Sequence, residues 1–318
     1  MTSVLLVAES DGYGSITQPS LEAIVAANQL IDSCITVVIA GDLSESASSL
    51  PVDRVVKISE IDTSDIGVYE QATADIASVV NSINPEVVLF SKSDFGSLVG
   101  ARVAFRIGAA FAADCTEISN PDGSVIVTRP VFGGSALAEY EITTSQAVIT
   151  LRPGAFLIAT EKGTPSIDDF TPEVTVDRRA LVSGTVLESR EGIRLEDANV
   201  IVSGGRGLGG PEPFSVLHDL ANVLDGAVGA SRAACDAGWI DHAYQVGLTG
   251  KSVSPDVYIA VGISGASQHM AGCSSSRAIV AINKDADSNI FKEARYGVVG
   301  DWEKVLPAFL DAVRNLKS

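Results

Sequence analysis

The residues best suited to chemistry lie in the last third of the chain, in turns that each follow a short apolar run. The first turn is glycine-rich and spans Gly204 to Gly210, after the run Val200 to Val202. Glycine lets backbone N–H groups approach anionic oxygens, a helix N-terminus favours negative charge, and Arg206 adds a cation, so this turn suits a pyrophosphate. The same spacing is equally typical of a tight structural turn, and both interpretations stay open.

A second turn carries an arginine at the end of a predicted strand. The run Ala227 to Ala234 changes from strand to small-residue turn to helix, and Arg232 comes where the helix begins. Open α/β sheets bind ligands at the carboxyl ends of their strands, so Arg232 is a candidate ligand contact. The alternative is a helix cap at Ser231 with a solvated Arg232.

The third turn is the richest in hydrogen-bonding side chains. It follows the run Val257 to Val261 and carries Ser264, Ser267, Gln268 and His269, one of only three histidines. A lone histidine is more often structural, but hydroxyl and amide groups around it offer several donors to one anionic or carbonyl-rich ligand. These groups together favour a ligand contact.

Two further polar residues follow later strands. Asn283 comes after the run Ala278 to Ile282, and Asp301 precedes a helix whose apolar stripe begins with Trp302. Asp301 is therefore predicted first as the N-cap of that helix. No G-x-S-x-G motif occurs, so hydrolase chemistry is unsupported.

Apolar runs and helical segments alternate along the chain, which is typical of parallel sheets covered by helices. In the first half the expected strands are Val4 to Glu9, Ile35 to Ala40, Val55 to Ile58 and Val87 to Phe90, and the expected helices are Pro19 to Ile31, Gly67 to Ile83 and Ser97 to Ala113. From Ala198 the expected strands are Val200 to Val202, Ala227 to Gly229, Val257 to Val261 and Ile279 to Ile282. The predicted fold is α/β, with an N-terminal parallel-sheet domain and a C-terminal doubly wound domain.

The alternation of apolar runs and helical segments changes between these two halves. Three runs, Val125 to Val127, Ala138 to Ile142 and Ala147 to Ile149, predict an antiparallel meander attached to the first sheet. A charged stretch from Glu161 to Asp197 marks the candidate boundary, and valines at 174, 176, 182 and 186 alternate with polar residues there, as in an edge strand. We place the N-terminal domain at residues 1–190 and the C-terminal domain at residues 191–318.

Composition narrows the function classes. The chain has 318 residues, 46% of them hydrophobic, and a net charge of −18, which opposes binding to the phosphate backbone of nucleic acids. Its four cysteines form no C-x-x-C pair, so any redox chemistry is expected from a bound organic cofactor rather than from zinc, iron–sulfur or dithiol sites. No apolar run reaches 18 residues, so no membrane span is expected, and the location is predicted as cytoplasmic, or the mitochondrial matrix in a eukaryote.

The C-terminal motifs resemble those of the α subunit of electron-transfer flavoproteins. The stretch Val257 to Asn283 is similar to the family signature, a strand followed by G-I-S-G-A-x-Q-H-x-x-G and then by I-V-A-I-N-K-D. Around it occur V-x-S-G-G-R-G, A-V-G-A-S-R-A-A-x-D-A-G, Q-V-G-x-T-G-K and Y-G-V-V-G-D, in the family's order. The N-terminal half matches mainly in length and layout.

The resemblance implies that FAD is held between the C-terminal domain and a β subunit. Arg232 would lie against the flavin ring, Thr249 would offer its hydroxyl near N5, and His269 would contact the O2 side. Cations and donors there stabilise negative charge on the ring and raise its potential, by roughly 60 mV per 1.4 kcal/mol for a one-electron couple. The cofactor-binding residues implied in this way are Arg206, Ser231, Arg232, Val246, Gly247, Leu248, Thr249, Ser264, Gly265, Ala266, Ser267, Gln268, His269, Asn283, Asp301 and Trp302.

Three positions depart from the family pattern. Leu248 stands where Gln is usual, Ser267 replaces a common aliphatic residue, and Arg295 stands where an Asp normally precedes Tyr-Gly. These changes bear on the flavin potential and on the choice of partner. They leave open a paralogue with a dedicated dehydrogenase, or a subunit of an electron-bifurcating complex.

The function implied by the resemblance is a heterodimeric electron carrier rather than an enzyme. It would shuttle electrons between flavin dehydrogenases and a downstream acceptor such as a quinone reductase. The alternative is a regulatory α/β protein that binds AMP or ATP without redox function, which the turn Gly204 to Gly210 would serve equally well. Thr249 and the turn Ser264 to His269 favour the flavoprotein, and a catalytic flavin dehydrogenase is disfavoured because no substrate base is found.

Overall fold

The computed structural model describes residues 2–10, 15–40, 44–58, 69–134, 136–174, 176 and 193–317. The chain divides into two compact units, one of Met1–Val131 with Leu137–Leu187 and one of Phe132–Ala136 with Glu188–Ser318. The expected boundary after residue 190 falls within residues 177–192, outside the described residues, and stays a prediction. Among the described helices, none has both the length and the apolar character needed to cross a membrane.

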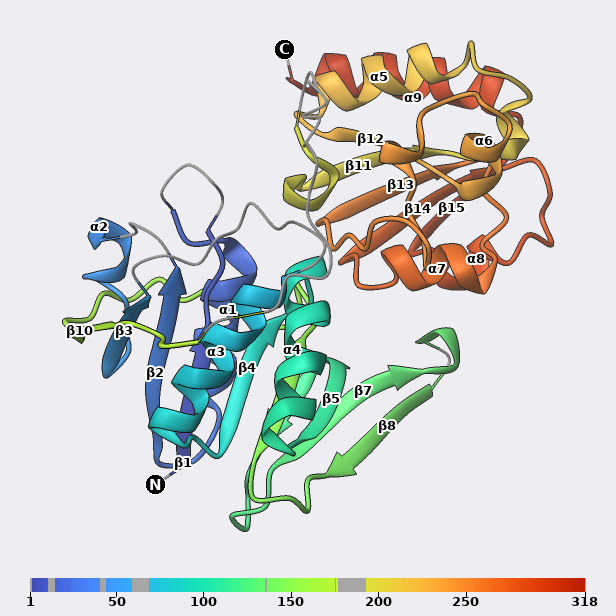
Figure 1. The fold of residues 1–318 in the computed structure, drawn as a ribbon. Helices are drawn as coiled ribbons and strands as arrows, with labels where there is room; N and C mark the ends of the chain where they lie inside the picture. Colours follow the sequence, from blue (N-terminus) through green and yellow to red (C-terminus); the bar gives the residue numbers. More distant parts are fainter. Residues whose placement is uncertain are drawn as a thin grey trace. The chain divides into compact units, whose positions relative to one another are not determined.

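The first unit is built on a seven-stranded sheet with the order β10-β3-β2-β1-β4-β9-β5, and its pairs are parallel (Figure 1). The strands are β1 (Thr2–Val7), β2 (Ser33–Ala40), β3 (Arg54–Ile58), β4 (Val87–Ser91), β5 (Ala110–Cys115), β9 (Ala147–Leu151) and β10 (Ser166–Phe170). The helices are α1 (Gln18–Asn28), α2 (Ser44–Ala47), α3 (Glu70–Ile83) and α4 (Asp94–Ile107). The predicted alternation of parallel strands and helices is thus confirmed.

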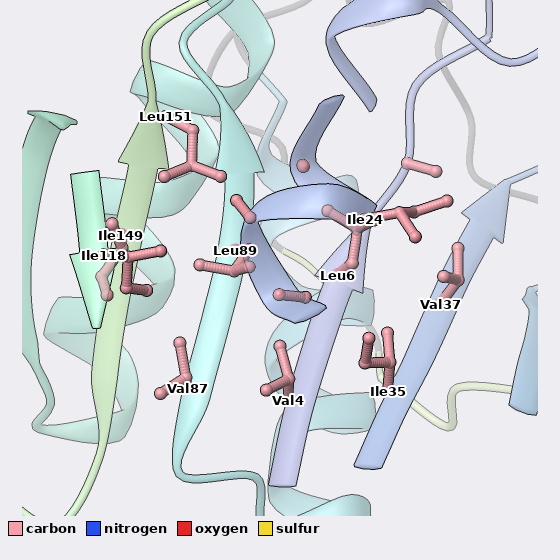
Figure 2. Packing of buried hydrophobic residues seen from close by; sticks show 14 of the residues in the cluster. Val4, Leu6, Ile24, Ile35, Val37, Val87, Leu89, Ile118, Ile149 and Leu151 are labelled. Carbon is pink, nitrogen blue, oxygen red and sulfur yellow. The ribbon is translucent and has the colours of Figure 1, made fainter. Parts of the chain in front are cut away.

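Strand β1 shows how the core of this unit forms. Val4 and Leu6 point to the face covered by α1 and pack with Ile24 (Figure 2), while Leu5 and Val7 pack in a second cluster with residues of α3 and α4. A strand buried on both faces needs a continuous apolar run, and the sequence has one here. Helices on both faces leave the strand ends as the place for polar side chains.

The antiparallel part of the first unit differs from the predicted meander. A three-stranded sheet of β6 (Glu117–Ser119), β7 (Ile126–Val131) and β8 (Ala136–Glu141) contains the first two predicted runs, with the 3₁₀ turn η1 (Phe132–Gly134) before β8. The third run is β9, which instead lies in the main sheet, parallel to both β4 and β5. All five residues of β9 are buried, as a central parallel strand requires, whereas β8 is mostly exposed.

Two other predictions in this unit were displaced along the chain. The edge strand is β10, parallel to β3, whereas Val174 and Val176 lie outside any strand, and positions 182 and 186 fall outside the described residues. The helix predicted to end at Ala113 ends at Ile107, because Gly108 adopts φ +71 and the following residues form β5.

The second unit is a five-stranded parallel sheet with the order β12-β11-β13-β14-β15. Its strands are β11 (Val200–Gly204), β12 (Ala227–Ala230), β13 (Val257–Val261), β14 (Ala278–Asn283) and β15 (Tyr296–Val299). Its helices are α5 (Phe214–Val223), α6 (Arg232–Asp236), α7 (Ser267–Cys273), α8 (Ile290–Glu293) and α9 (Trp302–Lys317), and its 3₁₀ turns are η2 (Leu195–Asp197), η3 (Arg206–Leu208) and η4 (His242–Tyr244). The doubly wound prediction is confirmed, since α5 and α9 lie on one face and α7 and α8 on the other (Figure 1).

Strand β15 was not predicted. All four of its residues are exposed, so the edge of the sheet lacks the buried apolar run by which the other strands were recognised. The strand order predicts where a ligand binds. The chain passes from β11 to β12 on one side of β11 and then returns to β13 on the other side of β11. Open sheets bind ligands at such a reversal, beyond the carboxyl ends of the strands.

Candidate functional site

A cavity of about 710 Å³ opens at the carboxyl ends of the strands of the second unit. Its walls come from the segments that follow β11, β12, β13 and β14, together with the turn after η4. Its volume lies within the range of roughly 300–1,000 Å³ that is typical of small-molecule and cofactor pockets. The lining residues are Arg206, Gly207, Ser231, Arg232, Ala233, Asp236, Gln245, Val246, Gly247, Leu248, Thr249, Gly262, Ile263, Ser264, Ala266, Gln268, His269, Asn283, Asp285 and Ser288.

Most of the predicted cofactor-binding residues are brought together in this cavity. They are Arg206, Ser231, Arg232, Val246, Gly247, Leu248, Thr249, Ser264, Ala266, Gln268, His269 and Asn283. Their individual contacts with a cofactor remain predictions. Their convergence follows from parallel strands, whose carboxyl ends meet at one edge of the sheet.

Four predicted residues do not line the cavity. Asp301 caps α9, with its Oδ1 accepting a hydrogen bond from the Glu303 N–H at 3.1 Å, and Trp302 packs against the apolar core. Gly265 has φ +75 and lies so close to α8 that a Cβ there would come within 2.2 Å of the Ile290 nitrogen. Ser267 is exposed and its Oγ donates only to the neighbouring Gln268 side chain, at 3.4 Å. These four residues lie outside the described cavity wall, and their contacts with a cofactor stay predictions.

The glycine-rich turn interlocks with the turn that follows β13. The N–H of Gly205 donates to Val261 O at 2.8 Å, and the N–H of Gly207 donates to Gly262 O at 2.9 Å. A Cβ on Gly205 would lie 2.3 Å from Gly262 O. These two amides are used inside the protein, so of the two interpretations the geometry favours the tight structural turn, which holds Arg206 at the cavity.

A chain of polar contacts joins two of the predicted flavin contacts. Thr249 Oγ1 accepts from Gln245 Nε2 at 3.0 Å, and Gln245 Oε1 lies 3.1 Å from Nδ1 of His242. His242 Nε2 lies 3.8 Å from Asp236 Oδ1, and Asp236 Oδ2 pairs with Arg232 Nε at 3.2 Å. Gln245 and Asp236 line the cavity but were not predicted. The signal for both was present, because each stands in a recognised motif block.

His269 is a buried side chain of the cavity wall, at 7% exposure. Its Nε2 lies 3.0 Å from the hydroxyl oxygen of Tyr258, and its Nδ1 has no hydrogen-bond partner. Burial lowers the pKa of His269 to about 4, so the imidazole is neutral at pH 7. It can donate or accept a hydrogen bond there, while the positive charge in the cavity wall comes from Arg206 and Arg232.

The loop after β14 was also missed as a cavity wall. Asn283 Nδ2 donates to Ile263 O at 3.0 Å and to Ser288 Oγ at 3.2 Å, so this side chain ties the two turns together. Ser288 and Asp285 reach the cavity from a loop without any periodic pattern. Asp285 ends the I-V-A-I-N-K-D motif, so a signal for it was present, whereas sequence spacing held none for Ser288.

The polar atoms of the wall fit a ligand with its own hydrogen-bonding groups. Ser231 Oγ and His269 Nδ1 are buried without a partner, although buried polar atoms are nearly always hydrogen-bonded. Apolar side chains at Leu248 and Ile263 line the same cavity. A flat heteroaromatic ring with carbonyl and nitrogen edges satisfies both features, as the isoalloxazine of FAD does.

Comparison with known proteins identifies the family. Residues 4–175 match the family model described as electron transfer flavoprotein domain, and residues 194–274 match the electron transfer flavoprotein FAD-binding domain. The chain belongs to the electron transfer flavoprotein alpha-subunit family. FAD is accordingly its cofactor, as predicted, and the non-redox AMP or ATP regulator is not favoured.

Several alpha subunits of this family are similar along most of the chain. The one from Thermoanaerobacterium thermosaccharolyticum is 42% identical over 78% of this chain and 76% of that relative. The one from Megasphaera elsdenii is 37% identical over 93% and 90%, and the one from Mycobacterium tuberculosis is 36% identical over 100% of both. The N-terminal unit, which resembled the family mainly in length and layout, is thus covered as well.

Proposed function

We propose that this electron carrier pairs with a β subunit and shuttles electrons from flavin dehydrogenases to a downstream acceptor such as a quinone reductase. The observation that carries the proposal is the convergence of Arg232, Thr249 and His269 on one cavity of the FAD-binding domain. The β subunit would supply the remaining wall. We also propose a cytoplasmic location, because the relatives named above are bacterial.

FAD supplies the reversible uptake of electrons when it is bound, and the protein holds and tunes it. Arg232 would place positive charge beside the ring, Thr249 would donate its hydroxyl near N5, and His269 would act at the O2 side. Thr249 Oγ1 accepts from Gln245 and donates to no group among the described residues, so its proton is available for this purpose. Arg206, with the turn Ser264 to Gln268, would hold the ribityl and phosphate part.

No base or nucleophile is needed for such a role. Arg232 pairs with Asp236, and its side chain stays largely exposed, with 66% of it accessible. Electron bifurcation is not proposed, because no feature of the described cavity favours it over simple electron transfer.

The test is to purify the chain together with its β subunit and to titrate the flavin. We expect a yellow heterodimer with FAD bound in this subunit's cavity, and a potential that falls by roughly 60 mV in Arg232→Ala, equivalent to about 1.4 kcal/mol. Arg206→Ala should weaken FAD binding with a smaller change in potential. Arg277→Ala is the control, because Arg277 pairs with Asp256 and does not line the cavity. A colourless heterodimer, or an unchanged potential in Arg232→Ala, would contradict the proposal.

A further inference from the structure

We propose that Gln245 is a positioning residue, which fixes the Thr249 hydroxyl so that its proton is left for an acceptor in the cavity. The inference rests on the proposed function, in which Thr249 donates near N5 of the flavin. Gln245 stands in the cavity wall, but only 4% of it is exposed. It therefore offers little surface to a cofactor, whereas its side-chain amide reaches a neighbouring side chain.

The backbone of Gln245 is held from both sides. Its N–H donates to His242 O at 3.0 Å, and its carbonyl oxygen accepts from the Lys251 N–H at 2.8 Å. Gln245 also forms a parallel bridge with Ala230, the last residue of β12. A Cβ added to Gly250 would lie 2.4 Å from Gln245 O, so the turn closes tightly over this residue. The side chain of Gln245 thus starts from a fixed point.

Both ends of the side-chain amide are engaged as well. Gln245 Nε2 donates to Thr249 Oγ1 at 3.0 Å, and Gln245 Oε1 lies 3.1 Å from Nδ1 of His242. A buried amide group without partners costs free energy, so a buried glutamine keeps the orientation in which both of its ends are bonded. These two contacts hold the amide in one place.

Thr249 depends on this amide for its orientation. It lies in an exposed turn, and the bond from Gln245 is the hydrogen bond that its hydroxyl forms among the described residues. A threonine hydroxyl has one proton and two lone pairs. Because Nε2 can only donate, it occupies a lone pair of Thr249 and leaves the proton for another acceptor. The cavity that Thr249 lines is where such an acceptor can bind.

A fixed hydroxyl affects the flavin more than a rotating one. A donor that is already oriented needs no reorganisation when negative charge grows beside it. Without Gln245, the Thr249 side chain could occupy about three staggered rotamers, so the donor would be in place about a third of the time. Gln245 would therefore help to set the flavin potential through Thr249, without adding a charge.

The first test is a redox titration of the FAD-loaded heterodimer. Gln245→Leu removes the amide, and we expect the reduced flavin to be bound about threefold less tightly relative to the oxidised flavin, a fall of about 30 mV for a one-electron couple. Gln71→Leu is the matched control. Gln71 Nε2 also donates to a nearby side chain, Asp75 at 2.8 Å, but it lies on α3 of the first unit and does not line the cavity. An unchanged potential in a folded Gln245→Leu protein would overturn the inference.

The second test asks whether Gln245 acts through Thr249. Thr249→Val removes the hydroxyl and nearly keeps the size of the side chain. We expect Gln245→Leu to lower the potential when Thr249 is present and to have no further effect in Thr249→Val, because residues that act as one unit are not additive. Equal falls in both backgrounds would show that Gln245 acts on the flavin directly or through the shape of the turn, and would overturn the inference.

The third test leaves Gln245 in place. Thr249→Ser keeps the hydroxyl and removes the methyl group that restricts its rotamers. Because Gln245 still holds the oxygen, we expect the wild-type potential. A fall as large as in Thr249→Val would show that the methyl group fixes the hydroxyl, and it would overturn the inference even if Gln245→Leu fails to fold. A colourless wild-type heterodimer would instead contradict the proposed function, and this inference with it.

Discussion

The two units share one architecture but treat the polar residues at their strand ends differently. In the first unit, Glu9 follows β1 and accepts a hydrogen bond from Ser93 Oγ at 2.7 Å, and Ser93 itself caps α4. In the second unit, the residues that follow β12 and β13 leave Ser231 Oγ and His269 Nδ1 buried without partners. The first unit also has a buried strand-end atom without a partner, Ser91 Oγ of β4, so the difference is that the second unit gathers two such residues in the wall of one cavity.

Charged residues show the same difference. Asp114 of the first unit accepts two hydrogen bonds from Arg152, at 2.9 and 2.6 Å, and lies 3.1 Å from Lys92. Although burial opposes it, these cations hold the pKa of Asp114 below its usual range. In the second unit, Arg232 has one ion-pair partner among the described residues, the exposed Asp236. Polar and charged side chains that lack a buried partner therefore indicate a binding site better than the fold does.

The largest effect should come from breaking the backbone packing that shapes the second unit's cavity. In Gly205→Ala, the new Cβ would meet Gly262 O at 2.3 Å, a backbone atom that cannot move aside. We expect a loss of about 3 kcal/mol in the free energy of unfolding, with weakened FAD binding, measured by urea unfolding. Gly210→Ala is the control, since its Cβ would meet only the flexible Glu212 carboxylate. Equal stability of the two variants would count against the interlocked turns.

The second prediction concerns the pH response of the second unit. The pKa of His269 is about 4 in the folded state and 6.5 as a model value, so the unfolded state binds more protons between these pH values. Stability is therefore complete above pH 6.5 and falls as the pH drops, by about 2 kcal/mol at pH 5. Tryptophan fluorescence in urea reports on this unit alone, because Trp239 and Trp302 both lie in it. His269→Asn should flatten the response.

The first unit should respond to pH in the opposite direction. Burial raises the pKa of Glu9 from 4.5 to about 7, so the folded state binds more protons between these values. Its contribution to stability is present at pH 4.5 and is lost as the pH rises through 7, by about 3 kcal/mol. Hydrogen exchange of the β1 and β4 amides should show greater protection at pH 5 than at pH 7. Glu9→Gln should abolish this trend, and the exposed Glu86→Gln should leave it intact; a trend unchanged in Glu9→Gln would refute the assignment.

The smallest expected effect tests how much Asp236 offsets the positive charge of Arg232. Asp236→Asn removes its exposed ion-pair partner, and such pairs contribute about 0.3–0.5 kcal/mol. The flavin potential should therefore rise by about 20 mV in a redox titration of the heterodimer. Asp219→Asn, on the exposed side of α5, should leave the potential unchanged. A fall in potential would mean that Asp236 orients Arg232 more than it offsets its charge.

The fold was predictable where burial imposes a pattern on the residues. Strands β1, β4 and β13 are continuous apolar runs, so they were recognised with nearly correct ends. Strand β15 was missed because all of its residues are exposed, and β9 was assigned to a meander because alternation does not reveal the pairing partner. Which distant strands pair depends on how the whole sheet assembles, and the local pattern of residues does not show this.

The site was predictable as a set of strand ends but not in its electrostatics. Arg232, Thr249 and His269 follow from where strands and motifs end, and they do share one cavity. The neutral state of His269 depends on its burial against Tyr258, which lies eleven positions earlier in the chain. Such a packing contact has no signature in local spacing.

Strand β10 has a consequence for how the molecule is made. The chain leaves β9 in one half of the first sheet and crosses to the other side, where β10 pairs with β3 and Asp168 meets Arg54 at 2.6 Å. During translation, β3 therefore remains an open edge until the ribosome has released Ser166–Phe170. An open parallel edge invites pairing with other nascent chains, so β10, with its two aspartates, protects the sheet from aggregation as the last strand to arrive.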